Sequence, residues 1–159
     1  MSTVSLSLDE IFDLAKKTLL ANGCDGETAS ILSDLIRNAE RDGSVSHGLF
    51  RLPAYVSGLK SGKINGKGKP EVKKISPSVI KVQGNNSLAP VVLSKSLPEL
   101  SKAAKENGVA VLAINNSHHM AAMWPETEKL QLEILKFRKL VLVHFLKGLK
   151  ELLLMILSL

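Results

Sequence analysis

Apolar residues recur at helical spacing in two consecutive segments near the start of the chain. The first stripe covers residues 11–20 and follows Ser7, which with Glu10 matches the Ser-x-x-Glu capping box of a helix N-terminus. The second stripe covers residues 29–39, and Asp25 stands where a helix N-cap is expected. We therefore predict two amphipathic helices that pack against each other through their apolar stripes.

The next part of the chain alternates between turn signals and short apolar runs. We predict a turn over residues 47–51, a helix over about residues 53–60 and a solvated, Gly- and Lys-rich loop over residues 60–69. Two strands are expected at residues 71–75 and 79–82, on either side of a Ser-Pro-Ser turn. This part of the chain therefore joins the helical region to a sheet.

Helical character returns at residues 97–107, and residues 108–114 form a continuous apolar run. Such a run is typical of a buried strand. A polar turn is expected directly after it, at residues 115–119. The order of elements predicts an α/β or mixed α+β fold, with N-terminal helices followed by a mixed sheet with helices.

The composition changes abruptly at Lys129. Of the last 31 residues, 12 are Leu. The longest uncharged runs, residues 140–146 and 152–159, fall far short of the ~20 residues that a membrane-spanning helix needs, so we expect no membrane span. The segment could be a basic amphipathic surface helix, or a terminal segment that buries its Leu side chains on the nearest apolar surface. We favour a third interpretation, in which residues 129–159 are a divergent tail translated from a shifted reading frame.

The charge is concentrated in this tail. Residues 129–159 hold six Lys and Arg against two acids, a balance of +4, whereas residues 1–128 hold fifteen against thirteen, a balance of +2. Aromatic residues make up only 4% of the chain, so no stacking platform accompanies the basic residues and we expect no nucleic-acid partner.

A single cysteine, Cys24, excludes an internal disulfide and is expected to be a turn or core thiol. The N-terminus shows no signal peptide, which favours a cytoplasmic location.

The first candidate site lies at residues 40–51. His47 and Arg51 are four residues apart, so one helical turn would place them on the same face. Arg51 can hold a carboxylate through two hydrogen bonds, and His47 can transfer a proton near neutral pH. Ser46 can orient the imidazole or cap the turn, and Gly48 would leave space for a ligand. Spacing alone also allows purely structural roles: Ser46 as an N-cap, His47 as a surface residue and Arg51 as half of an exposed ion pair. A hydrolase is disfavoured because no Gly-x-Ser-x-Gly elbow occurs.

The second candidate site lies at residues 115–125, after the predicted buried strand. Ligands of open α/β sheets gather at the carboxyl ends of strands, and the small Ala121 and Ala122 would let a flat ring or a phosphate approach. His118 and His119 are adjacent rather than four apart, and no Cys, Asp or Glu stands at ligand spacing, so we expect no metal. The chain has neither a Gly-x-Gly-x-x-Gly fingerprint nor a P-loop.

Both clusters match one known family. The pattern Arg-Asp-Gly-x-x-Ser-His-Gly-Leu-x-Arg-x-Pro-x-Tyr at residues 41–55 resembles the signature of the malate/L-lactate dehydrogenase-type oxidoreductases, which have a non-Rossmann cofactor fold. The pattern Asn-x-Ser-His-His-x-Ala-Ala-x-Trp-Pro at residues 115–125 resembles their cofactor-contacting segment. The His-His and Trp-Pro details are most similar to the branch of Δ1-piperideine-2-carboxylate/Δ1-pyrroline-2-carboxylate reductases. The resemblance extends over residues 5–128.

The resemblance implies a role for each matching residue. His47 would be the proton donor, Ser46 would belong to a charge relay with it, and Arg51 would bind the substrate carboxylate. The cofactor, NADPH or NADH, would contact His118, His119, Met120, Ala121 and Ala122. Met120 stands where Phe is expected in the family, which is an apolar exchange.

The resemblance also implies a reaction and a partner. The expected activity is reduction of a cyclic 2-imino acid to L-proline or L-pipecolate by a homodimeric enzyme. The alternative is a malate, L-lactate or ureidoglycolate-type dehydrogenase of the same family. Family members are about twice as long as this chain. Their relay aspartate lies in a region that has no counterpart in this sequence. The resemblance therefore also implies that the chain alone is a poor catalyst or an inactive fragment.

Overall fold

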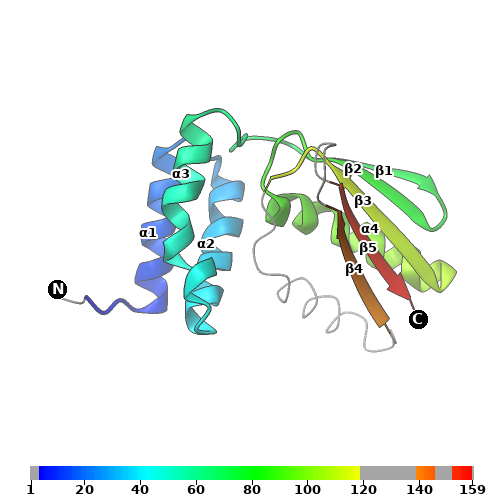
Figure 1. The fold of residues 1–159 in the computed structure, drawn as a ribbon, viewed down its shortest axis with the longest axis horizontal. Helices are drawn as coiled ribbons and strands as arrows, with labels where there is room; N and C mark the ends of the chain where they lie inside the picture. The colour runs from blue at the N-terminus through cyan, green and yellow to red at the C-terminus, as the bar shows by residue number, and fades with distance from the viewer. Residues whose placement is uncertain (1–3, 119–138, 146–151, 159) are drawn as a thin grey trace. The chain divides into compact units, whose positions relative to one another are not determined.

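The computed structural model describes residues 4–118, 139–145 and 152–158. The chain divides into two compact units, Met1–Lys67 and Gly68–Leu159, and each is described by itself. The first unit is helical and the second contains a sheet (Figure 1). The predicted mixed fold, with helices preceding a mixed sheet, is therefore confirmed.

The first unit begins with the two predicted helices, α1 (Leu8–Ala21) and α2 (Gly26–Arg41). Both predicted caps are present. The Glu10 N–H donates to Ser7 Oγ at 3.2 Å and the Ser7 N–H donates to Glu10 Oε2 at 2.8 Å, while the Thr28 N–H donates to Asp25 Oδ1 at 2.8 Å. The sequence therefore determines where both helices start.

Helix α3 (Leu52–Lys60) completes the first unit, in which α1 packs against both α2 and α3 (Figure 1). Its buried apolar residues come from all three helices: Ile11, Ala15, Leu19, Ala29, Leu32, Leu35, Ile36, Ala39, Leu52 and Tyr55. Cys24 is buried beside them, and burial raises the pKa of its thiol to about 11. Cys24 is therefore the predicted core thiol and remains protonated at neutral pH.

The second unit is a five-stranded mixed sheet with one long helix on one face (Figure 1). Its elements are β1 (Glu71–Ser76), β2 (Val79–Gln83), α4 (Ala89–Asn107), β3 (Val109–Asn115), β4 (Lys139–Phe145) and β5 (Leu152–Ser158). The strand order is β1-β2-β3-β5-β4. Strands β2 and β3 are parallel and joined through α4, whereas the other neighbouring strands are antiparallel.

Strand β3 is less buried than its apolar run suggests. Ala110, Leu112 and Ile114 are fully buried in the core against α4, whereas Val111 and Ala113 are only partly buried. The predicted buried strand is therefore present, but only its alternate residues are fully buried. Side chains alternate between the two faces of a strand, and α4 covers only one of them.

Helix α4 begins eight residues before the predicted start, at Ala89 instead of residue 97. Pro90 occupies the first turn, where a missing N–H costs nothing, and the helix continues through Pro98. Burial of the apolar first turns, including Val91, Val92 and Leu93, outweighs the lost hydrogen bond.

The tail contributes two strands to the sheet. Strand β5 pairs antiparallel with β3 from Val109↔Ser158 to Ile114↔Leu153, and β4 pairs with β5. The possibility of a surface helix is therefore wrong for residues 139–145 and 152–158. The origin of residues 129–159 stays a prediction. No helix in the described part of the chain is long and apolar enough to cross a membrane.

Candidate active site

The first cluster forms the connection between α2 and α3. Gly43 has a φ of +70°, a conformation that glycine adopts without strain, and it ends α2. The chain then makes two short 3₁₀ turns, η1 (Val45–His47) and η2 (Leu49–Arg51), before α3 begins. The predicted turn is confirmed, but it is two turns separated at Gly48. His47 and Arg51 therefore do not lie on the one continuous helical turn that their spacing had predicted.

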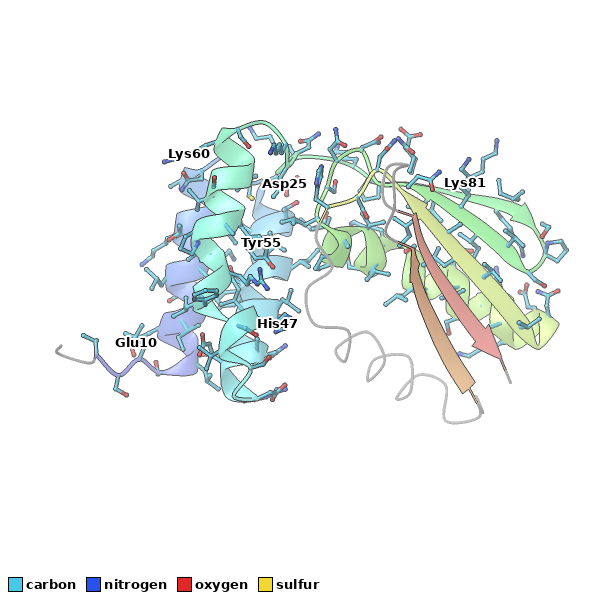
Figure 2. All side chains as sticks on the ribbon, in the orientation of Figure 1. Glu10, Asp25, His47, Tyr55, Lys60 and Lys81 are labelled. Atoms are coloured by element: carbon cyan, nitrogen blue, oxygen red, sulfur yellow. The ribbon has the colours of Figure 1, made fainter. Side chains whose placement is uncertain are left out.

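His47 is oriented through its Nδ1 atom. Ser46 Oγ lies 3.0 Å from His47 Nδ1, as a relay partner would, and Ser44 Oγ lies 3.1 Å from the same atom. The histidine is half-buried at one end of the helical unit (Figure 2). Both hydroxyl groups meet the same ring nitrogen, so contacts at Nδ1 set the orientation of the imidazole. Sequence reasoning missed Ser44, although its position three residues before His47 was an available signal.

The Arg51 side chain also contacts this turn, through the backbone of Ser46. Its Nε donates a hydrogen bond to the Ser46 carbonyl oxygen at 2.8 Å. Ser46 therefore contacts both partners, His47 through its hydroxyl and Arg51 through its carbonyl. This arrangement uses one edge of the guanidinium, and its two Nη groups form the fork that can bind a carboxylate.

Gly48 has a different role from the one predicted. A Cβ at Gly48 would overlap the side chain of Glu40. Glu40 Oε1 accepts a hydrogen bond from the Leu49 N–H at 2.7 Å, so the last turn of α2 is tied to the start of η2. The space beside Gly48 therefore admits Glu40 rather than a ligand, and the prediction of ligand space was wrong.

Tyr55 is the last residue of the first motif and lies one helical turn after Arg51. Its side chain is buried on α3 (Figure 2). Burial raises the pKa of its hydroxyl to about 12, and the positive charge of Arg51 opposes this increase. Tyr55 therefore stays neutral and anchors α3 in the core of the first unit, which fixes the backbone that follows Arg51.

The second cluster begins where β2 and β3 end together. Gln83 and Asn115 are paired at the carboxyl ends of these parallel strands, and the polar bend follows Asn115. The bend is fixed by backbone hydrogen bonds from the loop that leads into α4. They join Gly84 N to Asn115 O (2.7 Å), Asn86 N to Asn116 O (2.8 Å), His118 N to Ser87 O (2.9 Å) and Ala89 N to His118 O (2.8 Å).

This bend depends on close backbone approach. A Cβ on Gly84 would lie 2.7 Å from the Asn116 carbonyl oxygen, so only glycine fits without a shift of the backbone. Asn116 itself has a φ of +52°, which asparagine tolerates better than most residues. His118 is the last residue of the segment that the structure describes. The other predicted cofactor residues, His119, Met120, Ala121 and Ala122, lie outside the described residues.

Two of the solved structures that resemble this chain are a reductase and a dehydrogenase. Residues of this chain superpose on Δ1-piperideine-2-carboxylate reductase from Pseudomonas syringae with a TM-score of 0.76 and 38% identity, covering 80% of this chain and 38% of that one. Malate dehydrogenase from Pyrococcus horikoshii gives a TM-score of 0.75 at 29% identity, covering 82% and 37%. The chain therefore has the fold of part of these two enzymes.

The family follows from the sequence comparison. Residues 6–133 match the family model described as malate/L-lactate dehydrogenase, and the chain belongs to that family. A Δ1-pyrroline-2-carboxylate/Δ1-piperideine-2-carboxylate reductase from Pseudomonas syringae is 38% identical over 126 residues, which are 79% of this chain and 37% of that protein. Δ1-pyrroline-2-carboxylate reductase 1 from Burkholderia ambifaria is 35% identical over 133 residues, 84% of this chain and 39% of that one. The chain thus spans less than two fifths of the length of these curated relatives.

Proposed function

We propose that this chain contains part of the active site of an NAD(P)H-dependent reductase of cyclic 2-imino acids. The substrates are Δ1-pyrroline-2-carboxylate and Δ1-piperideine-2-carboxylate, and the products are L-proline and L-pipecolate. The observation that supports this most is the turn at residues 44–51, where Ser46 contacts both an imidazole and a guanidinium. A proton donor beside a carboxylate-binding group suits a small ring acid with an imine nitrogen.

The protein residues position the substrate and supply the proton. The Nη groups of Arg51 hold the substrate carboxylate through charge-assisted hydrogen bonds, which fixes the orientation of the ring. His47 gives the proton from Nε2 to the ring nitrogen as that nitrogen becomes an amine. Ser46 keeps Nδ1 engaged, so the imidazole does not rotate away from the substrate.

The cofactor segment is assigned to His118, His119, Met120, Ala121 and Ala122. Its described part fits this role, because the bend lies at the carboxyl ends of two parallel strands and its backbone is held by the loop before α4. NADPH or NADH supplies the hydride when bound.

A second candidate function is oxidation or reduction of a 2-hydroxy or 2-oxo acid such as malate, L-lactate or ureidoglycolate. The malate/(S)-sulfolactate dehydrogenase of Methanothermus fervidus is 38% identical over 114 residues, which supports this alternative. The same turn would serve, because Arg51 needs only a carboxylate and His47 can protonate a carbonyl oxygen. The reductases named above support the imino-acid assignment.

A side-by-side assay of NADPH and NADH oxidation separates the two functions. Δ1-pyrroline-2-carboxylate, Δ1-piperideine-2-carboxylate, oxaloacetate and pyruvate are tested in parallel, with His47→Gln as the inactive control. We expect any turnover that the chain supports to be well above that of the 2-oxo acids when the substrate is an imino acid. Preferential turnover of oxaloacetate or pyruvate would reverse the assignment.

The 159-residue polypeptide is proposed to be slow or inactive on its own, because the family resemblance assigns its relay aspartate and further binding residues to a region that this chain does not match. Turnover at ordinary enzyme rates by the purified chain would overturn that proposal. In that case the assay above also decides the substrate directly.

We further propose a cytoplasmic homodimer by analogy with the family, and light scattering on the purified protein tests its oligomeric state.

A further inference from the structure

Two serine hydroxyl groups meet one nitrogen of His47, although the family resemblance assigns a role only to Ser46. Ser44 Oγ lies 3.1 Å and Ser46 Oγ 3.0 Å from His47 Nδ1. We propose that Ser44 is a second positioning residue of His47, which together with Ser46 keeps the imidazole in the tautomer that has its proton on Nδ1. The proposal rests on the proposed function of His47 as the proton donor.

The tautomer decides whether Nε2 can complete a proton-transfer cycle. An imidazolium that gives its proton from Nε2 becomes neutral with the remaining proton on Nδ1. The same tautomer can take a proton back at Nε2. A hydroxyl oxygen accepts from Nδ1–H in both states, so a serine partner does not have to reorganise during the cycle.

Ser44 is better anchored than Ser46. Its N–H donates to the Ala39 carbonyl oxygen in the last turn of α2 at 2.8 Å. Its carbonyl oxygen accepts from the His47 N–H, also at 2.8 Å. The backbone of Ser44 is therefore fixed both to α2 and to the histidine that its hydroxyl contacts.

The surroundings of the two hydroxyl groups also differ. Ser44 is half-buried, whereas Ser46 is exposed. Water competes less for a half-buried hydroxyl, and a hydrogen bond is stronger where solvent is partly excluded. One Nδ1–H can be shared between two acceptors in a three-centre bond. We infer that Ser44 supplies the larger part of the orientation and that Ser46 adds to it.

Imidazole ¹⁵N NMR on the full chain tests this directly. The protein is labelled at its four histidines, and the His47 signals are assigned from a His47→Asn variant. Spectra are recorded without substrate or cofactor at a pH where His47 is neutral. We expect the Nδ1–H tautomer to predominate in the wild type, the Ser44→Ala signals to move toward the mixture of an unrestrained histidine, and Ser46→Ala to move them less.

Ser44→Thr is the matched control, because it retains the hydroxyl, and it should restore the wild-type ring signals. It also keeps the test decisive if Ser44→Ala does not fold, since a folded Thr variant with an unrestrained ring would contradict the proposal. A wild-type Nε2–H tautomer, or Ser44→Ala signals identical to wild type, would also overturn it. The NMR readout needs neither hydride transfer nor a ligand. A failed substrate assay would therefore count against the proposed function without deciding the role of Ser44.

Discussion

At the residue scale, the turn that positions His47 depends on the contact between Glu40 and Gly48. The Glu40 carboxylate occupies the volume that any larger residue at position 48 would need, and it accepts the Leu49 N–H at 2.7 Å. This hydrogen bond joins residues nine positions apart, so it ties the end of α2 to the segment that leads to Arg51. A larger residue at position 48 would therefore displace the Glu40 side chain from this hydrogen bond.

We predict that Gly48→Ala lowers the free energy of unfolding by about 1–3 kcal/mol, because the added methyl group displaces Glu40. Urea denaturation measures the change. Gly26→Ala is the matched control, since no atom lies within 4 Å of a Cβ at that helical position, and it should leave stability unchanged or raise it by about 0.5–1 kcal/mol. Equal effects of the two substitutions would show that the Glu40 contact is unimportant.

The sequence predicted single residues better than their contacts. Ser46, His47 and Arg51 stand in a dense motif that a reader can find without a structure. Glu40 and Ser44 were not assigned, because their roles depend on how the chain folds back at Gly43 and Gly48. The same folding changed the interpretation of Gly48, whose missing side chain makes room for a protein carboxylate and not for a ligand.

At the element scale, local signals located the helix starts well. The capping box at Ser7 and Glu10 and the cap at Asp25 require only neighbouring residues, so sequence alone determines them. The start of α4 and the half-burial of β3 depend on which surfaces meet, and one α4 face covers one sheet face. Such tertiary contacts override local propensity.

The α1 cap should respond to pH. The hydrogen bond from the Ser7 backbone N–H, followed by that from its hydroxyl, lowers the pKa of Glu10 below its ordinary value. A lowered folded-state pKa adds stability above the unfolded value of about 4.3, and that stability is lost as the pH falls through the folded value. We expect the wild type to lose more stability than Glu10→Gln between about pH 5 and pH 3. Thermal unfolding at a series of pH values measures this, and the same loss of stability in the wild type and in Glu10→Gln would contradict the prediction.

At the scale of the whole molecule, the chain combines a family segment with a tail of a different character. The family model ends at residue 133, and the curated relatives are much longer than this chain. The tail supplies β4 and β5, which pair beside β3 in the sheet. Strand pairing requires only backbone groups and apolar side chains, so a Leu-rich segment of any origin can add to a sheet edge.

A shifted reading frame would explain the composition of residues 129–159. We predict that resequencing the coding DNA beyond codon 128 and translating the other frames reveals a continuation that matches the malate/L-lactate dehydrogenase family. The abrupt rise in Leu at residues 129–159 is the reason for this expectation. If no frame gives a family match, residues 129–159 are a native tail of this protein.

Joint binding of a planar ring acid by Arg51 and His47 is tested most directly by an NMR titration with pyrrole-2-carboxylate. We expect the ligand to shift the backbone amide signals of residues 46–51, and Arg51→Ala to weaken binding by about 10- to 100-fold, as the loss of a charge-assisted pair implies. Arg41→Ala, which removes an exposed partner of Asp42, should bind as the wild type does. Undiminished binding by Arg51→Ala, or shifts confined to residues outside this turn, would contradict the account.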